Sequence, residues 1–209
     1  MTAAVGTALG LGLASGLSLY GTAFLTGLAI HLGWVRLQPD WAALGVLAEP
    51  TVLLVTGSLF AVELLADKVP WVDSAWDALH TLVRPIGGAL LALRALGQVD
   101  PAVEIIALLL LGGATLTTHA AKASLRLLVN LSPEPVSNVI VSLAENGVLV
   151  GTVWLALAHP LIALGAGTLG LGGAAWLVWA LGRRVARAVR ARRGRSAPAV
   201  GAGTGPVAR

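Results

Sequence analysis

Residues 63–85, ELLADKVPWVDSAWDALHTLVRP, carry seven ionisable side chains. The chain around them is strongly apolar: 56% of its 209 residues are hydrophobic, 11% are charged, and the mean hydropathy is +0.84. Because a charged side chain is costly to place in apolar surroundings, this stretch must face water or other polar groups. The apolar segments on either side of this stretch therefore decide the fold class.

Six apolar segments are long enough to cross a bilayer, which takes about 20 residues. They cover residues 6–33, 41–66, 76–97, 102–128, 136–159 and 161–182. A soluble fold would have to bury all six, and too little polar sequence remains to cover such a core. The pattern predicts an all-α, polytopic membrane helical bundle with about six transmembrane helices. The 26 glycines favour helices that pack through small residues.

The basic residues are concentrated at the C-terminal end. Eight of the 14 lysines and arginines follow Gly182, so that residues 1–182 are net acidic. We expect residues 1–182 to form the transmembrane domain and 183–209 to be a basic, disordered cytoplasmic tail on anionic lipid. A basic run directly after a hydrophobic span favours this interpretation over nucleic acid. The absence of cysteine excludes disulfides and thiolate metal sites.

The distribution of positive charge also predicts the orientation. With the tail in the cytoplasm, six spans place the N-terminus there too, and Lys68, Lys122 and Arg126 near span ends agree with this side. The first segment has an alternative, because ASGLSLYGT, residues 14–22, has the Gly and Ser spacing at which a helix can break or re-enter.

Polar residues recur along one helical face after the turn at Pro70. They are Asp73, Asp77, His80 and Arg84, at i, i+4, i+7 and i+11. Pro85 lies within the same apolar helix and predicts a kink. Residues 41–97 thus read as a Pro-containing helix–turn–helix hairpin with one polar stripe.

A second hairpin repeats this design around the Pro-Glu-Pro turn at 133–135. Its first helix carries Thr115, His119, Lys122 and Arg126 at i, i+4, i+7 and i+11; its second carries Asn138, Ser142 and Glu145. A shift of 65 residues aligns Pro70 with Pro135 and Asp77 with Ser142. An internal repeat is consistent with this match, either parallel or inverted.

We expect the stripes to meet, because so many charges cannot face lipid cheaply. The candidate substrate- or ion-binding residues are Glu63, Asp67, Asp73, Asp77, His80, Arg84, His119, Lys122, Arg126, Asn130, Ser137, Asn138 and Glu145. The acids and His80 would take up protons or cations, the basic residues would pair with them or bind anions, and the Asn and Ser side chains would offer neutral ligands.

Three functions fit this pattern. The first is a transporter or channel for a small ion or polar solute. The second is a membrane-embedded enzyme or binding protein acting on a lipid headgroup, although no HExxH, GxSxG or DDxxD-like motif occurs. The third is a non-catalytic scaffold in which the charges only anchor helix ends. We favour transport, expect no cofactor, assign no catalytic residue, and leave a metal open, since Asp73 and Asp77 at i, i+4 are a weak Mg²⁺ signal.

Two long motifs carry a family resemblance. They are ELLADKVPWVDSAWDALHTLVRPIGGAL, residues 63–90, and KASLRLLVNLSPEPVSNVIVSLAEN, residues 122–146. The first resembles the family pattern at Glu63, Asp67, Lys68, Pro70, Asp73, Trp76, Asp77, His80, Arg84 and Pro85. The second resembles it at Lys122, Arg126, Asn130, Ser132, Pro133, Glu134, Pro135, Ser137 and Asn138.

The chain thereby resembles a bacterial membrane family known as domain of unknown function 4126, over most of residues 10–160. The resemblance implies a small multi-span protein of the bacterial inner membrane and supplies no activity. Where the family pattern has an acidic pair, this chain has Glu145-Asn146. The similarity of ELLADK to a short element of cation exchangers adds weight to transport, and a homodimer would enlarge the small interior of six spans.

Overall fold

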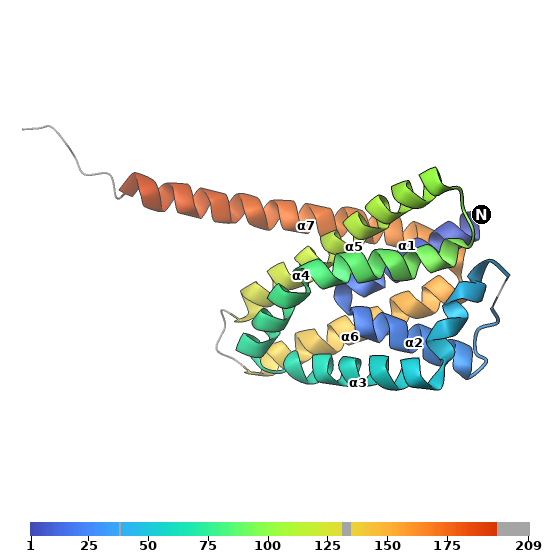
Figure 1. Ribbon diagram of the computed structural model, residues 1–209. Helices are drawn as coiled ribbons and strands as arrows, with labels where there is room; N and C mark the ends of the chain where they lie inside the picture. Colours follow the sequence, from blue (N-terminus) through green and yellow to red (C-terminus); the bar gives the residue numbers. More distant parts are fainter. Residues whose placement is uncertain (38, 131–134, 196–209) are drawn as a thin grey trace, which may run out of the picture.

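The computed structural model describes residues 1–37, 39–130 and 135–195, and these are helical with short connections. Seven α-helices and two 3₁₀ segments follow one another in this part of the chain (Figure 1). They are α1 (Thr2–Leu17), α2 (Leu19–His31), η1 (Pro39–Ala48), α3 (Pro50–Ala66), α4 (Pro70–Leu93), η2 (Arg94–Leu96), α5 (Pro101–Asn130), α6 (Pro135–Ala158) and α7 (Pro160–Arg195). The all-α prediction is confirmed.

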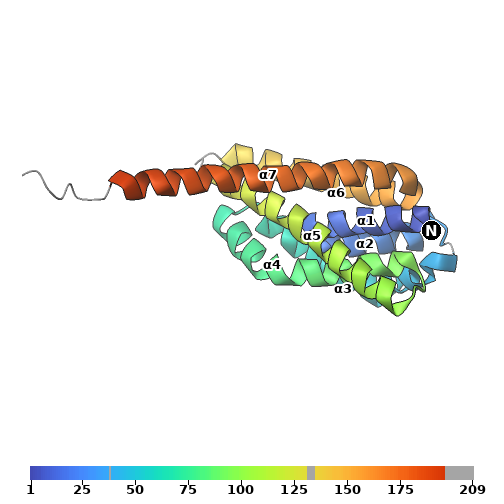
Figure 2. The same ribbon diagram turned by 90° about the horizontal axis from the view of Figure 1, so that it is seen from above.

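Proline begins each of the five long helices, α3 to α7. This is favourable because the first helical position needs no amide donor and the fixed φ of proline is already helical. Pro85, in contrast, lies inside α4, which continues through it as one helix and bends along its length (Figures 1 and 2).

The distribution of side chains is the reverse of that in a soluble protein. Arg84 and Arg126 are the largest fully buried side chains, whereas Leu54, Leu82 and Leu109 are more than two-thirds exposed at 71%, 75% and 73%. An apolar exterior around a charged interior is stable only in contact with lipid. The protein is therefore a multi-pass membrane protein.

Among the described residues, four helices, α4 to α7, are long and apolar enough to cross a membrane. A fifth crossing is available if η1 and α3, which meet at a bend of 75°, act as one span. The remaining apolar helices, α1 and α2, are too short by the same measure. The first predicted span, over residues 6–33, is thus replaced by two short helices.

These two helices form a hairpin with Ser18 at its tip. The Thr7 hydroxyl of α1 donates to the carbonyl of Ala156 near the end of α6 (2.8 Å). After Ser18 the chain turns back, and Gly27 of α2 packs against the carbonyl of Leu47, at the end of the bundle where α1 begins (Figure 1). The predicted break within residues 14–22 is therefore present, in its re-entrant form.

The hairpin changes the predicted orientation. Because α1 and α2 enter and leave at the same end, the N-terminus and the last turn of α7 lie at opposite ends of the bundle (Figures 1 and 2). This arrangement differs from the one that six spans would give, in which both termini lie at the same end of the bundle. The predicted disordered tail also differs, since α7 continues as a helix through residues 183–195; residues beyond 195 lie outside the described part.

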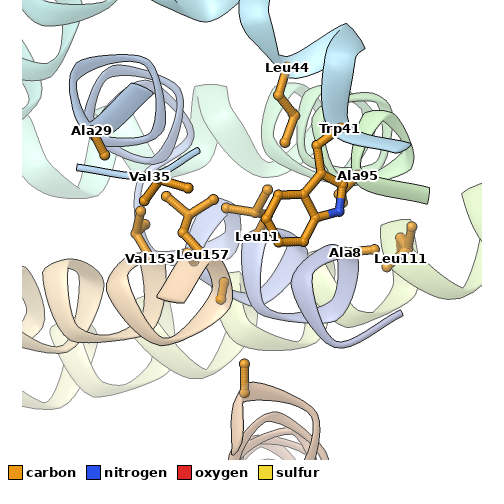
Figure 3. Packing of buried hydrophobic residues seen from close by; sticks show 14 of the residues in the cluster. Ala8, Leu11, Ala29, Val35, Trp41, Leu44, Ala95, Leu111, Val153 and Leu157 are labelled. Atoms are coloured by element: carbon orange, nitrogen blue, oxygen red, sulfur yellow. The ribbon is translucent and has the colours of Figure 1, made fainter. Parts of the chain in front are cut away.

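The two ends of the bundle have different interiors. Trp41 of η1 packs with Leu11 of α1, Ala95 of η2 and Leu157 of α6 in an apolar cluster near the N-terminal end (Figure 3). α3 and α5 both end, and α4 and α6 both begin, at the other end of the bundle, as a parallel repeat requires (Figure 1). That second end holds the charged residues.

Candidate functional site

Arg84 is the centre of the first half of the site, and its side chain is 0% exposed. Its Nη2 donates to Glu63 Oε1 (2.5 Å), and its Nη1 donates to Asp77 Oδ1 (2.8 Å). Glu63 lies in the last turn of α3, so that the arginine of α4 joins two helices. The second oxygen of Glu63, Oε2, accepts from the hydroxyl of Ser18 at the hairpin tip (2.5 Å).

His119 of α5 completes this half. Arg84 Nη1 lies 2.7 Å from His119 Nδ1. Because a guanidinium can only donate, Nδ1 accepts, and the ring proton is assigned to Nε2. That nitrogen faces the hydroxyl of Thr81 (3.2 Å), which donates to the main-chain carbonyl of Asp77 (2.9 Å). The stripes of the two hairpins therefore meet, as predicted.

Arg126 is the centre of the second half. Its Nη2 and Nε donate to Glu145 Oε2 at 2.6 and 3.0 Å, which joins α5 to α6. Its Nη1 donates to the carbonyl of Asp67 (3.2 Å), its Nη2 lies 3.4 Å from Asp67 Oδ2, and Asp73 Oδ1 lies 3.9 Å from Nε. Asp73 is in the first turn of α4, where the helix dipole also favours a negative charge.

Lys122 connects this half to the hairpin tip. Its Nζ donates to the carbonyl of Leu17, the last residue of α1 (3.1 Å). It also lies 3.6 Å from Asp67 Oδ2 and 3.9 Å from Glu145 Oε2. The terminal carbonyls of a helix lack intrahelical donors and carry partial negative charge, so that the break at Ser18 provides a partner for this ammonium.

We call the nine residues of the two halves the polar network: Glu63, Asp67, Asp73, Asp77, Arg84, His119, Lys122, Arg126 and Glu145. The network contains five carboxylates against three permanent cations, a formal excess of two negative charges with His119 neutral. Lys68, which is half-buried and donates to Ser142 Oγ (2.5 Å), reduces this excess to one when it is counted. Buried charge of one sign requires compensation by protons or by a bound cation.

A small cavity lies between the two halves. It measures about 10 Å³, room for about one water molecule. Its lining includes Ser18, Glu63, Asp67, Lys122 and Glu145, so that both halves reach it. The predicted shared pocket is thus present but narrow, and most of its charges contact one another directly.

Two buried polar atoms of the first half have no hydrogen-bond partner among the described residues, Asp77 Oδ2 and Arg84 Nε. A buried carboxylate oxygen without a donor is costly when ionised. The position is therefore suited to a proton, a water molecule or a cation. No group of three or more His, Asp and Glu side chains arranged for a metal occurs in the described ranges.

His80 lies apart from the network. Its Nδ1 is 2.8 Å from the carbonyl of Trp76, its Nε2 is 3.2 Å from the Tyr20 hydroxyl, and its ring stacks on that of Trp76. Because both nitrogens have neutral partners, His80 packs α4 against α2. Its predicted role in ion handling has no support from these contacts.

The remaining predicted residues lie near the α5–α6 turn. Ser137 is in the first turn of α6, and the side chains of Asn130 and Asn138 lie outside the described part of the chain. Residues not predicted from the stripes are Ser18, Thr81 and the carbonyl of Leu17. The signal for Ser18 and Leu17 was the Gly/Ser spacing of residues 14–22; Thr81 had none.

A bundle of apolar helices around internal ion pairs, with a re-entrant hairpin ending on them, defines a multi-pass helical membrane protein with a buried charged centre. Residues 5–184 match the family described as Domain of unknown function (DUF4126), and the chain belongs to this family. No curated protein and no solved structure matches the chain.

Proposed function

We propose that this protein is a transporter or channel that moves a small ion, a cation or a proton, across the membrane through the polar network. The observation that carries the proposal is the excess of buried carboxylates over cations around the tip of a re-entrant hairpin. A site that only fixed helix ends would gain nothing from unbalanced charge, because each buried negative charge in excess of the cations costs stability.

The broken helix supports the same conclusion. Ion sites in transporters commonly use half-helices that end in the membrane, because the free carbonyls of one half attract cations and the free amides of the other attract anions. Here the last carbonyl of α1 accepts from Lys122, and Ser18, the cap of α2, contacts Glu63. Both poles of the break thus face the network.

The orientation that we propose follows from positive charge. Lys68, Lys122 and Arg126 lie toward the end of the bundle at which α7 ends, together with the arginines of α7 that follow Gly182. This end therefore faces the cytoplasm of a bacterial inner membrane and anionic lipid. The guanidinium carbon of Arg183 lies over the Trp179 ring, 4.7 Å from the ring centroid, as expected for a residue pair at a membrane interface. The N-terminus then lies outside.

The experiment is ion flux into proteoliposomes, with Na⁺, K⁺ and a proton gradient tested in turn. Asp77→Asn keeps the size of the side chain and removes its charge and its capacity for a proton. We expect flux to fall about tenfold or more, as for a loss of at least about 1.4 kcal/mol of ion stabilisation.

The matched control is Glu104→Gln, the corresponding acid-to-amide change at an exposed carboxylate in the first turn of α5. Its flux should equal that of the wild type. Equal flux in folded Asp77→Asn, or no flux of any of these ions in the wild type above empty liposomes, would rule out the proposal.

A further inference from the structure

We propose that the ammonium of Lys122 is a tethered counter-ion in a site for a monovalent inorganic cation, and that such a cation binds by displacing it. The inference rests on the proposed function, because it names the ligand class of the same network. The site is formed by the carbonyl of Leu17 and the carboxylates of Asp67 and Glu145.

The three oxygens come from three different elements. Leu17 O ends α1, Asp67 caps α3, and Glu145 is in α6, and all three lie within 3.9 Å of Lys122 Nζ. Oxygen atoms of carboxylates and free carbonyls are the ligands that hard cations prefer. An ammonium and an alkali cation carry the same charge, so that one can replace the other without changing the net charge of the site.

The cavity provides the space for the exchange. It lies against the Lys122 side chain, and its volume of about 10 Å³ suits a particle the size of one water molecule. Lysine carries its charge on four flexible methylene groups, whereas the guanidinium of Arg126 is fixed by its hydrogen bonds to Glu145 and Asp67. Lys122 is therefore the cation of this half that can move.

The charge of the site favours a monovalent ion. Arg126 already contacts both carboxylates, at 3.4 Å from Asp67 Oδ2 and 2.6 Å from Glu145 Oε2. Counted over Asp67, Glu145, Arg126 and the cation at the Lys122 position, one alkali ion in place of the ammonium keeps the local formal charge at zero, whereas a divalent ion would add one positive charge.

The test is the thermal midpoint of the purified full-length protein in NaCl, KCl and choline chloride at equal ionic strength. A ligand that binds only the folded state raises the midpoint with its concentration. In Lys122→Met the competing charge is gone, so that half of the Na⁺ or K⁺ response should occur at a concentration about tenfold lower than in the wild type, or lower still. Choline is too large for the cavity and should give no response.

The matched control is Lys68→Met, the same change at a lysine that donates to Ser142. Its salt response should equal that of the wild type.

Addition of Asp67→Asn to Lys122→Met should abolish the response. An unchanged half-effect concentration in Lys122→Met, or an equal effect of choline, would overturn the inference. So would a stability that follows pH but is identical in all three salts, since the proton alone would then be the ligand.

Should Lys122→Met fail to fold, the wild type carries the test. Its small-cation response at high salt must disappear in Asp67→Asn, and its persistence would overturn the inference. The result is separable from transport. A cation response without flux would retain this site and remove the proposed function, whereas flux without a selective response in Lys122→Met would remove this site only.

Discussion

Arginine at position 84 is explained by its geometry. Its guanidinium contacts Glu63, Asp77 and His119 from one buried point, with Nη1 serving two of them. Such a planar fork with several donors can bridge acceptors on three helices at once, which an ammonium cannot do in the same geometry. Much of the cohesion between α3, α4 and α5 therefore depends on a single side chain.

Replacement of Arg84 should be strongly destabilising. Arg84→Met leaves Glu63 and Asp77 buried without their cation, which typically costs about 3–5 kcal/mol. We expect Arg84→Lys to recover less than half of this loss, because one ammonium cannot reach all three partners. Thermal unfolding in detergent measures the stability of both variants, Arg84→Met and Arg84→Lys. Arg94→Met, at an exposed position, is the control. An Arg84→Lys variant as stable as the wild type would contradict this account.

At the scale of the helices, residue spacing predicted which helix faces carry the polar residues, but it did not predict in which direction each helix runs. The i, i+4, i+7 pattern placed Asp77, Arg84, His119 and Arg126 on facing stripes, because helical periodicity is local. The antiparallel direction of α2 relative to α1, in contrast, depends on contacts between residues far apart in the sequence. Ser18 has an extended backbone (φ −153, ψ 113) that is compatible with a kink or a reversal, and the packing of Gly27 on Leu47 selects the reversal. His80 matches the spacing of the stripe, but its partners are the neutral Trp76 carbonyl and Tyr20 hydroxyl, which periodicity does not reveal.

The hairpin depends on glycine where it approaches α5. A Cβ on Gly16 would lie 2.5 Å from the carbonyl of Thr115 and 2.7 Å from Thr118 Cβ, closer than real atoms approach. Gly16→Ala should therefore displace the tip from His119 and destabilise the protein by about 1–3 kcal/mol. Gly113→Ala, in α5 with nothing within 4 Å, should leave stability unchanged. Thermal midpoints of the two variants give the comparison, and equal midpoints would exclude this close packing.

For the whole molecule, hydropathy identified a membrane protein with six apolar segments, of which the described structure has four helices, or five spans with the bent pair, that are long enough to cross. Residues 6–33 have the length and composition of one span, and a hairpin of 16 and 13 residues has the same composition. At about 1.5 Å per residue, α1 and α2 are about 24 and 20 Å long, shorter than the roughly 30 Å of hydrocarbon that a crossing requires. The composition of residues 6–33 is the same whether or not the chain reverses at Ser18. Only tertiary contacts therefore distinguish a single span from a hairpin.

A single span and a re-entrant hairpin place the N-terminus on different sides of the membrane. Because the chain contains no cysteine, the side can be measured directly by labelling single introduced cysteines. In the re-entrant arrangement Thr2 and Glu104 lie at the same end of the bundle and Arg190 at the other; with six spans Thr2 would share a side with Arg190. Single Thr2→Cys, Glu104→Cys and Arg190→Cys variants should be tested with a membrane-impermeant maleimide in intact cells. We expect labelling of Thr2→Cys and Glu104→Cys, and labelling of Arg190→Cys only after permeabilisation, because the arginines after Gly182 retain that end in the cytoplasm. Labelling of Thr2→Cys together with Arg190→Cys would mean that α1 and α2 cross the membrane as one span, and Ser18 would then lie on a different path from the one on which the ion site depends.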